Sequence, residues 1–240
     1  VKAEAVNVAQ FEFIPWLLGR CAGLAEARAA LAKLNLVGTP FSAHFPAAQL
    51  PWLVADRTGA LVVESVADGL HVYDCPEGVL TNNPPFPIQH FGLNRYLGLS
   101  PRQPENRFSD QLELSAFSRG MGALGLPGDL SSGSRFVRAA FVRANSRSGE
   151  SEAARVGQFF HILGAVEQQK GCCEVRPGEF EYTIYTSCWN AQRGVYYYTT
   201  YENRRITAIR LRAENLDAQT LFRFPLVQQQ SICYLNGENA

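Results

Sequence analysis

Asn82 and Arg135 are the two side chains of this sequence whose types and places could serve chemistry. Asn82 follows a short predicted strand, Val79–Thr81, within the run Thr81-Asn82-Asn83-Pro84. A carboxamide fixed at the end of a strand can donate a hydrogen bond to an oxyanion, although asparagine is as readily explained as a turn residue. Arg135 stands at the start of a predicted helix, where the backbone already carries partial positive charge. The arginine therefore either points to solvent or has an anion or thiolate beside it.

The segment before Arg135 can bring the backbone close to another surface. Four glycines occupy positions 120, 122, 125 and 128, and glycine adopts positive φ values at little steric cost. An aspartate and three serines between positions 129 and 134 can accept hydrogen bonds from the first turn of a helix. Phe136, Val137, Ala140 and Phe141 then repeat with the spacing of a buried helical face. The pattern predicts a glycine-rich loop that leads into a helix over about residues 133–145.

The composition excludes several classes of protein. A chain of 240 residues is long enough for one large domain or two small ones, and its 46% hydrophobic residues permit a sizeable core. The 22 basic residues balance the 22 acidic ones, whereas a nucleic-acid-binding protein needs a basic surface. The sequence contains no apolar run long enough to span a membrane and shows no signal-peptide pattern at its start. We therefore expect neither a nucleic acid nor a membrane as a partner.

The cysteines and histidines are dispersed. The cysteines at positions 21, 75, 172, 173, 188 and 233 include no CxxC pair, and the four histidines form no recognised catalytic motif. We therefore expect no metal and no cofactor. Free, buried thiols in a reducing, cytoplasmic compartment are the expected state. Cys188 could be considered as a nucleophile, but it lies within a predicted strand and nothing near it favours a thiolate.

The periodicity of the chain predicts alternating blocks of helices and strands. Helices are expected at residues 10–20, 24–34, 133–145 and 152–169, a loop at 36–46, and a polar, proline-containing excursion at 100–117. Strands are expected at residues 52–56, 60–64, 70–74, 79–81, 180–189, 195–201, 206–211 and 222–227. Short turns such as Asp68-Gly69 require antiparallel pairing. The tyrosines between 182 and 201 are read as a packed sheet rather than a ligand cage, because they alternate within strands. This order predicts an α+β fold: a single domain over residues 1–240, with two sheets face to face and helices outside, in four layers.

Long collinear motifs of this sequence resemble the choloylglycine hydrolase family, which includes conjugated bile salt hydrolases and penicillin V acylases. The motifs are Thr81-Asn82-Asn83-Pro84, Ser118–Asp129, Ser131–Phe136, Gly69–Asp74, Gln158–Leu163, Val166–Gly171, Tyr182–Cys188 and Gly194–Tyr198. The resemblance covers nearly the whole chain. It implies an N-terminal-nucleophile hydrolase fold, with two antiparallel sheets between helical layers.

The resemblance also implies a reaction. An N-terminal cysteine thiol would attack the amide between a bile acid and glycine or taurine, with its own α-amine as the base. Asn82 matches the family asparagine that hydrogen-bonds around the nucleophile and its amine. Arg135 matches the arginine beside the thiol, where a cation favours the thiolate. Phe41 and Phe45 match a substrate loop whose apolar faces could line a steroid groove.

Partners and alternatives follow from the same resemblance. Residues 100–117 resemble the assembly loop of the family, so a homotetramer is expected. The substrate class is expected to be a small molecule, a conjugated bile salt. An acylase that prefers penicillin V or another acyl amide is the first alternative, and a non-catalytic module that binds bile acids or a protein partner is the second.

The sequence departs from the family pattern at its start. Position 1 is valine, and no cysteine stands where the family has its nucleophile. The opening region of the family, with the nucleophile, an arginine, an aspartate and a further asparagine, has no counterpart here. We therefore expect this chain to be the C-terminal majority of such an enzyme, inactive as it stands, with Asn82 and Arg135 assisting a nucleophile supplied elsewhere. Sheet edges that the absent strands would pair are expected to be exposed.

Overall fold

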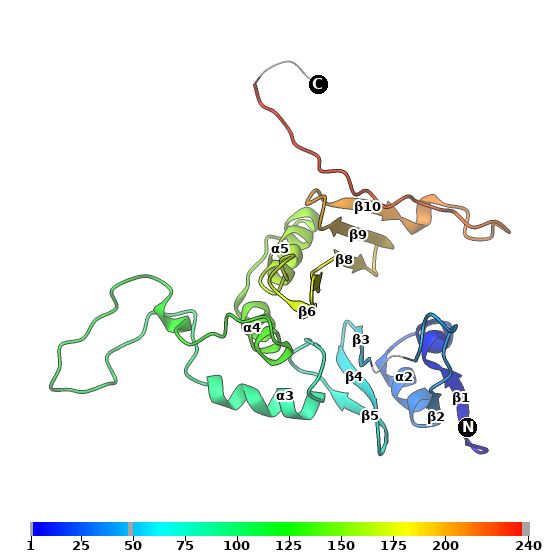
Figure 1. Ribbon diagram of the computed structural model, residues 1–240, viewed down its shortest axis with the longest axis horizontal. Helices are drawn as coiled ribbons and strands as arrows, with labels where there is room; N and C mark the ends of the chain where they lie inside the picture. Colours follow the sequence, from blue (N-terminus) through cyan, green and yellow to red (C-terminus); the bar gives the residue numbers. More distant parts are fainter. Residues whose placement is uncertain (1, 48–49, 237–240) are drawn as a thin grey trace. The chain divides into compact units, whose positions relative to one another are not determined.

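A computed structural model describes residues 2–47 and 50–236 of the chain (Figure 1). Val1, on which the expectation about the start of the chain depends, lies outside the described residues. The chain separates into two compact units, Val1–Asn145 and Ser146–Ala240, and each contains helices together with an antiparallel three-stranded sheet. The predicted α+β class is confirmed, while the single domain stays a prediction.

The sheet of the first unit has the predicted strands. It runs in the order β3 (Trp52–Asp56), β4 (Gly59–Val66) and β5 (Gly69–Asp74), and both pairs are antiparallel. Asp56 pairs with Gly59, and Val66 pairs with Gly69, so each connection is a two-residue turn. The middle of β4 is buried on both faces, because side chains alternate along a strand and a layer covers each side.

One layer on this sheet comes from the N-terminal helices. After a short 3-10 turn at Gln10–Glu12, α1 (Phe13–Leu18) and α2 (Leu24–Leu31) bury their apolar residues against Val63 of β4. The predicted helix at 24–34 ends at Leu31, and the predicted loop begins inside a strand. Residues Leu34–Val37 form β2, which pairs in parallel with β1 (Val6–Ala9). Local propensity favours a helix up to residue 34, but the tertiary pairing with β1 overrides it.

The other layer comes from α3 (Phe86–Gly92), which the sequence did not predict, and α4 (Ser132–Asn145). The Phe86 ring lies 6.2 Å from the ring of Phe136 and 5.9 Å from that of Tyr73 on β5, between centroids. The predicted strand at 79–81 is wrong. Thr81 is held by side chains instead, because its hydroxyl bonds to Gln89 of α3 and to Ser132 of α4.

Residues 100–120 form an extended excursion without helix or strand, as predicted (Figure 1). Gly120 and Gly125 of the glycine-rich loop have φ values of 85° and 92°, which confirms that the loop uses positive φ. Gly122 is buried in the following 3-10 turn, Met121–Ala123. The Ser100 N–H donates to the carbonyl oxygen of Gly122 over 2.8 Å. The loop therefore closes the base of the excursion by backbone contact.

Gly122→Ala is expected to destabilise the first unit. A Cβ atom at this position would lie 1.8 Å from the carbonyl oxygen of Arg102 and 2.4 Å from that of Ser100. Backbone must move to relieve such a clash, at a cost of about 1–3 kcal/mol. Gly133→Ala is the matched control, since a Cβ there meets nothing within 4 Å and alanine is the better helix former. Thermal unfolding measures both, and an equal melting temperature for the two variants would contradict the prediction.

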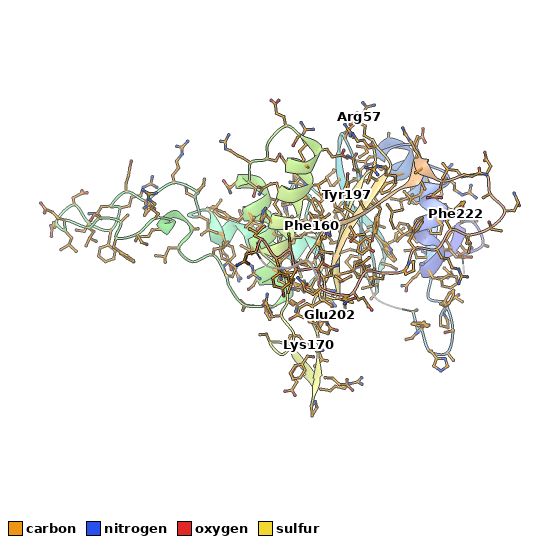
Figure 2. All side chains as sticks on the ribbon, turned by 90° about the horizontal axis from the view of Figure 1, so that it is seen from above. Arg57, Phe160, Lys170, Tyr197, Glu202 and Phe222 are labelled. Atoms are coloured by element: carbon orange, nitrogen blue, oxygen red, sulfur yellow. The ribbon has the colours of Figure 1, made fainter. Side chains whose placement is uncertain are left out.

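The second unit holds α5 (Glu152–Gly164) and a sheet in the order β10 (Thr207–Arg210), β9 (Val195–Thr200) and β8 (Tyr185–Asn190). The Ser151 hydroxyl caps α5 by accepting the Ala154 N–H over 3.1 Å. Glu152 of α5 accepts hydrogen bonds from Tyr197 of β9 over 2.9 Å and from Asn190 of β8 over 2.6 Å. Figure 2 places Phe160 on the helix and Tyr197 on the sheet.

Two predicted boundaries and one predicted strand in this unit are wrong. Helix α5 ends at Gly164 instead of continuing to 169. The predicted strand 180–189 is interrupted: Phe180 ends β7 (Glu179–Phe180), which pairs with β6 (Glu174–Arg176), and β8 begins only at Tyr185. Residues 222–227 form no strand, because side chains hold Val227: the Tyr198 hydroxyl accepts its N–H over 3.2 Å, and the Thr200 hydroxyl donates to its carbonyl over 3.1 Å. A 3-10 turn, Leu211–Ala213, follows β10.

None of the helices in the described part of the chain has the length and apolar character needed to cross a membrane.

Candidate active site

The loop after Thr81 and the start of α4 bring Asn82 and Arg135 together. The Arg135 Nη2 atom donates a hydrogen bond to Oδ1 of Asn82 over 3.0 Å, although the two residues are 53 positions apart. The Arg135 Nε atom donates to the carbonyl oxygen of Leu130 over 3.1 Å. Two residues chosen separately from the sequence thus form one polar pair, and the guanidinium is fixed at two of its nitrogens.

The pairing fixes the orientation of the Asn82 side chain. A guanidinium carries only hydrogen-bond donors, so the amide atom that faces it must be the oxygen. The Nδ2 group of Asn82 then remains as a donor for a third group, and no described residue accepts from it. Asn82 is exposed and Arg135 half-buried. The pair therefore presents an N–H donor at the surface, backed by a positive charge.

The reading of Arg135 as a side chain free in solvent is wrong, while the reading with a nearby anion or thiolate stays a prediction. The side chain does not point freely to solvent, and none of the ion pairs formed by the described residues includes it. Neutral oxygens hold the cation next to the N-terminus of α4, whose own partial charge has the same sign. The charge of Arg135 favours an anion placed beside it.

Asp129 stabilises the loop that leads into α4 and positions Arg135. Its carboxylate accepts hydrogen bonds from the Ser131 N–H, over 2.9 Å, and from the Ser134 hydroxyl. Hydrogen bonds from Ser131 and then Ser134 lower the pKa of Asp129 to about 2. The Ser131 hydroxyl accepts the N–H of Ser134 at the start of α4. Ser131 and Asp129 thus accept backbone N–H groups at the helix start as predicted, whereas the hydroxyls of Ser132 and Ser134 donate, to Thr81 and Asp129.

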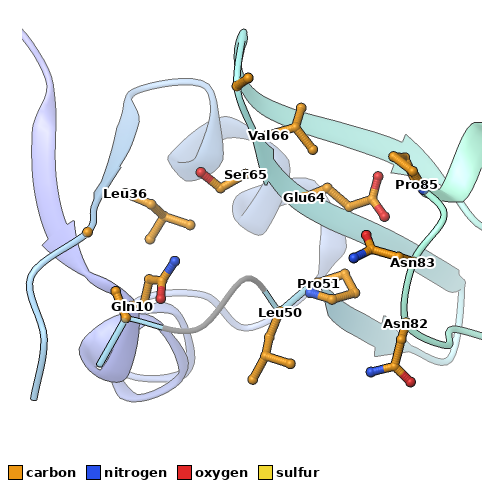
Figure 3. A pocket seen from close by; sticks show the side chains of 13 residues that line it. Gln10, Leu36, Leu50, Pro51, Glu64, Ser65, Val66, Asn82, Asn83 and Pro85 are labelled. Atoms are coloured by element: carbon orange, nitrogen blue, oxygen red, sulfur yellow. The ribbon is translucent and has the colours of Figure 1, made fainter. Parts of the chain in front are cut away.

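A cavity of about 490 Å³ opens beside the two asparagines (Figure 3). Asn82 and Asn83 line it on one side, and Gln10 and Leu36 lie across from them. Glu64 of β4 also lines it and was not predicted from the sequence. A single carboxylate beside the run Leu61-Val62-Val63 was the signal that could have identified it.

An apolar cavity of about 390 Å³ adjoins the first one, and the two share Gln10, Ala47 and Leu50. Phe41 and Phe45 line it, as do Phe11, Ile14 and Trp52, which were not predicted from the sequence. The Phe41 ring lies 5.2 Å from that of Phe11 and 6.4 Å from that of Phe45. The loop is closed on itself, because the Phe41 N–H donates to the carbonyl of Phe45 over 3.1 Å.

The cysteines are all free, but most are not buried as expected. Cys75 is buried, whereas Cys172 and Cys233 are exposed and the other three are half-buried. Burial raises the pKa of both Cys75 and Cys188, which disfavours the thiolate that a nucleophile needs. In the first unit, Cys75 donates to the carbonyl of Val79 and Cys21 packs against the core. Neither is among the residues that line the two cavities.

Within the described ranges, no three histidine, cysteine, aspartate or glutamate side chains are grouped so that they could hold a metal ion.

Comparison with known proteins gives the class of enzyme. Solved structures with this fold include a variant of the conjugated bile acid hydrolase from Clostridium perfringens, with a TM-score of 0.89 and 36% sequence identity. That match covers 98% of this chain and 72% of the other. Penicillin V acylase from Agrobacterium tumefaciens shares the fold at a TM-score of 0.65 and 19% identity, over 88% of this chain and 59% of the other. The fold is that of the N-terminal-nucleophile hydrolases, which confirms the predicted fold class.

Sequence comparison then gives the family. Residues 1–224 match the linear amide C–N hydrolases of the choloylglycine hydrolase family. The chain is 54% identical over 224 residues to the bile salt hydrolase/transferase of Lactiplantibacillus plantarum. This match covers 93% of the chain and 69% of the relative. It is 37% identical over 232 residues to the corresponding protein of Clostridium perfringens, covering 96% of this chain and 70% of the relative. The chain therefore belongs to the choloylglycine hydrolase family.

Proposed function

We propose that this chain provides catalytic and substrate-binding residues for the hydrolysis of the amide bond in glycine- or taurine-conjugated bile salts. The observation that carries the proposal is the hydrogen bond between Arg135 and Asn82 at the edge of a cavity that adjoins an apolar one. A conjugated bile salt has an apolar steroid body and a polar amide end, so it needs both kinds of surface side by side. The relatives named bile salt hydrolase/transferase support this substrate class.

The proposed reaction passes through a cysteine thiolate. Its sulfur attacks the carbonyl carbon of the amide and forms a C–S bond, while the carbonyl electrons move onto the oxygen. Asn82 Nδ2 donates to that oxyanion, and the Arg135 charge lowers the pKa of the thiol. The oxyanion collapses to a thioester as the C–N bond breaks, and the amine of glycine or taurine leaves with the proton that the α-amine base had taken from the thiol. Water then cleaves the thioester, which releases the bile acid and restores the thiol.

The nucleophile of this proposal is not one of the six cysteines of the chain. Cys75 and Cys188 have raised pKa values, and none of the six cysteines is among the residues that line the two cavities. The proposal therefore places the thiol, and the α-amine that acts as its base, on polypeptide outside these 240 residues. Amino acid release by the purified 240-residue chain alone would disprove this placement.

The test of the function compares substrates on the complete gene product. Release of glycine or taurine from conjugated bile salts is the expected result. Release of phenoxyacetic acid from penicillin V in its place would identify an acylase. Binding of bile acids without any hydrolysis would identify a non-catalytic module.

Phe41→Ala and Phe45→Ala are each expected to raise the KM for conjugated bile salts, with a smaller effect on kcat. The two rings line the apolar cavity, and truncating a phenylalanine that packs on an apolar ligand costs about 1–3 kcal/mol of binding. That cost corresponds to roughly a 5- to 150-fold change in KM. Phe180→Ala, on β7 of the second unit, is the control. A KM that stays at the wild-type value in both variants would contradict the assignment of this cavity to the steroid.

Two further properties are part of the proposal. Residues 100–117 carry the exposed rings of Phe108 and Phe117, with 82% and 86% of their surface accessible, which supports the proposal that this excursion assembles a homotetramer. Six unpaired cysteines support a reducing, cytoplasmic environment. Sedimentation of the complete protein tests the first of these, since a monomer would refute it.

A further inference from the structure

Gln89 is a buried polar residue that forms hydrogen bonds to the loop carrying Asn82. It lies on α3 with only 5% of its surface exposed. Its Nε2 atom donates to the carbonyl oxygens of Asn82, over 2.6 Å, and of Pro84, over 2.7 Å. Its Oε1 atom accepts the hydroxyl of Thr81 over 2.6 Å. One side chain therefore binds the backbone or side chain of three of the four residues from Thr81 to Pro84.

Only a carboxamide fits this position. The two groups that face Nε2 are carbonyl oxygens, which accept and cannot donate, so the nitrogen must face them. The group that faces Oε1 is a hydroxyl, which can donate. Both N–H bonds and the oxygen are thus used. A glutamate here would place a negative oxygen against two carbonyls, and an apolar side chain would leave both carbonyls without this partner.

The same network connects the loop to the helix that carries Arg135. The Ser132 hydroxyl, in the first turn of α4, donates to the Thr81 hydroxyl over 3.0 Å. The Thr81 proton in turn faces Gln89 Oε1 over 2.6 Å and the carbonyl of Ser132 over 3.2 Å, so the shorter contact is the stronger bond. Asn82 and Arg135 are therefore joined twice, once directly and once through Gln89, Thr81 and Ser132.

Glu64 fixes the N-terminus of α3, the helix that carries Gln89. Both oxygens of its buried carboxylate accept the N–H of Phe86, the first residue of α3, over 2.9 and 3.1 Å. Glu64 comes from the central strand of the sheet, and Figure 3 shows it beside the loop residues Asn83 and Pro85. The helix that bears Gln89 is thus anchored to the sheet, so Gln89 holds the loop against a fixed support.

We propose that Gln89 is a positioning residue, which aims the Asn82 side chain so that Oδ1 stays on Arg135 and Nδ2 stays free for the reacting oxygen. Its effect on catalysis rests on the proposed function, whereas its effect on the Asn82–Arg135 pair does not. Gln89 touches neither Arg135 nor a cavity wall, among the contacts of the described residues. It acts through the loop.

The first test uses the 240-residue chain and follows the Arg135 guanidinium by NMR. In the wild type, the hydrogen bond to Asn82 is expected to slow rotation and exchange of the Nη2 protons, which then give a separate signal at low temperature. Gln89→Met keeps the length and apolar bulk of the side chain but removes its hydrogen bonds, and the separate signal is expected to disappear. Leu31→Val is the matched control, because it weakens the core at α2, which lines neither cavity. Persistence of the signal in Gln89→Met would overturn the inference.

The second test uses the complete gene product and conjugated bile salts. Gln89→Met is expected to lower kcat by about 10- to 100-fold with KM within about twofold of the wild type, since misplacement of a catalytic group by about 1 Å has effects of this size. Gln89→Glu is expected to be at least as impaired at neutral pH and to recover relative to the wild type as the pH falls, because a protonated carboxyl can again donate to one carbonyl. Gln89→Met has no such group and stays impaired.

The outcomes separate the inference from the proposed function. If the wild-type gene product releases no glycine or taurine, the proposed function fails, and the NMR comparison alone decides the role of Gln89. If the wild type is active and both Gln89 variants lose activity in proportion to their loss of stability, as Leu31→Val does, Gln89 has only a structural role and the inference is wrong.

Discussion

Arg135→Ala in the complete enzyme is expected to lower kcat at neutral pH by about 10- to 1000-fold. A positive charge within a few ångströms lowers the pKa of a thiol by about 1–3 units, and each unit is a tenfold change in the thiolate fraction once the pKa exceeds the working pH. Removing Arg135 raises that pKa, so the reactive thiolate becomes scarce. The loss is expected to shrink as the pH rises, since alkaline solution restores the thiolate. Thiol titration and the pH profile of kcat/KM measure the effect.

Two controls separate the charge of Arg135 from its hydrogen bonds. Arg135→Lys keeps the charge but cannot reproduce the bonds to both Asn82 and Leu130, so its thiol pKa should stay closer to the wild-type value. Arg147→Ala removes one exposed positive charge of the second unit and is expected to leave the pH profile unchanged. An unchanged thiol titration curve in Arg135→Ala would show that the cation does not act on the nucleophile.

The position of Arg135 was open to prediction because it breaks a local rule. A cation at the N-terminus of a helix opposes the helix dipole, so it needs a reason outside the helix. Asn82 was visible for a related cause, as a carboxamide after an apolar, β-rich stretch. Their direct contact was not predictable from the residues, because it joins positions 53 apart and depends on how α4 packs on the sheet.

The supports of the pair were missed because their signals were non-local. Gln89 follows three prolines between positions 84 and 87, and α3 was not predicted. Its amide becomes informative only when the carbonyls of Asn82 and Pro84 are seen to face it. Glu64 lies in a strand that was predicted correctly, yet its side chain could equally have pointed to solvent. Burial decides its meaning, and burial depends on the layer formed by α3.

The strands also divide into those with local sequence signals, which were predicted, and those that depend on distant contacts, which were not. Turns of two residues fix the partners of β3, β4 and β5, so local chemistry was sufficient. The parallel pairing of β1 with β2 joins segments separated by two helices, and short strands of four residues carry little periodic signal. Residues 79–81 and 222–227 have the composition of strands, but hydrogen bonds with the side chains of Gln89, Tyr198 and Thr200 take the place of a ladder.

Asn82→Asp distinguishes the two roles that Asn82 could have. Aspartate keeps an oxygen for Arg135, so the loop and the pair should persist, with the hydrogen bond converted to an ion pair. It loses the Nδ2 donor and sets a negative charge where the oxyanion forms. If Nδ2 stabilises that oxyanion, kcat is expected to fall by at least about 100- to 1000-fold, the effect of removing one such donor. Steady-state kinetics of the complete enzyme measure this, with thermal unfolding to show that the fold is retained.

Asn82→Ala separates the loss of the donor from the added negative charge. Alanine removes both the donor and the oxygen that holds Arg135, but it adds no charge. If Asn82 serves only to hold Arg135, then Asn82→Asp should remain active and Asn82→Ala should not. If Nδ2 acts on the oxyanion, both variants fail, and the aspartate fails more severely because its charge repels the oxyanion and offsets that of Arg135. Asn215→Asp adds the same charge in the second unit while keeping its own hydrogen bond from the Asp217 N–H, over 3.1 Å, so it shows whether added charge alone affects kcat.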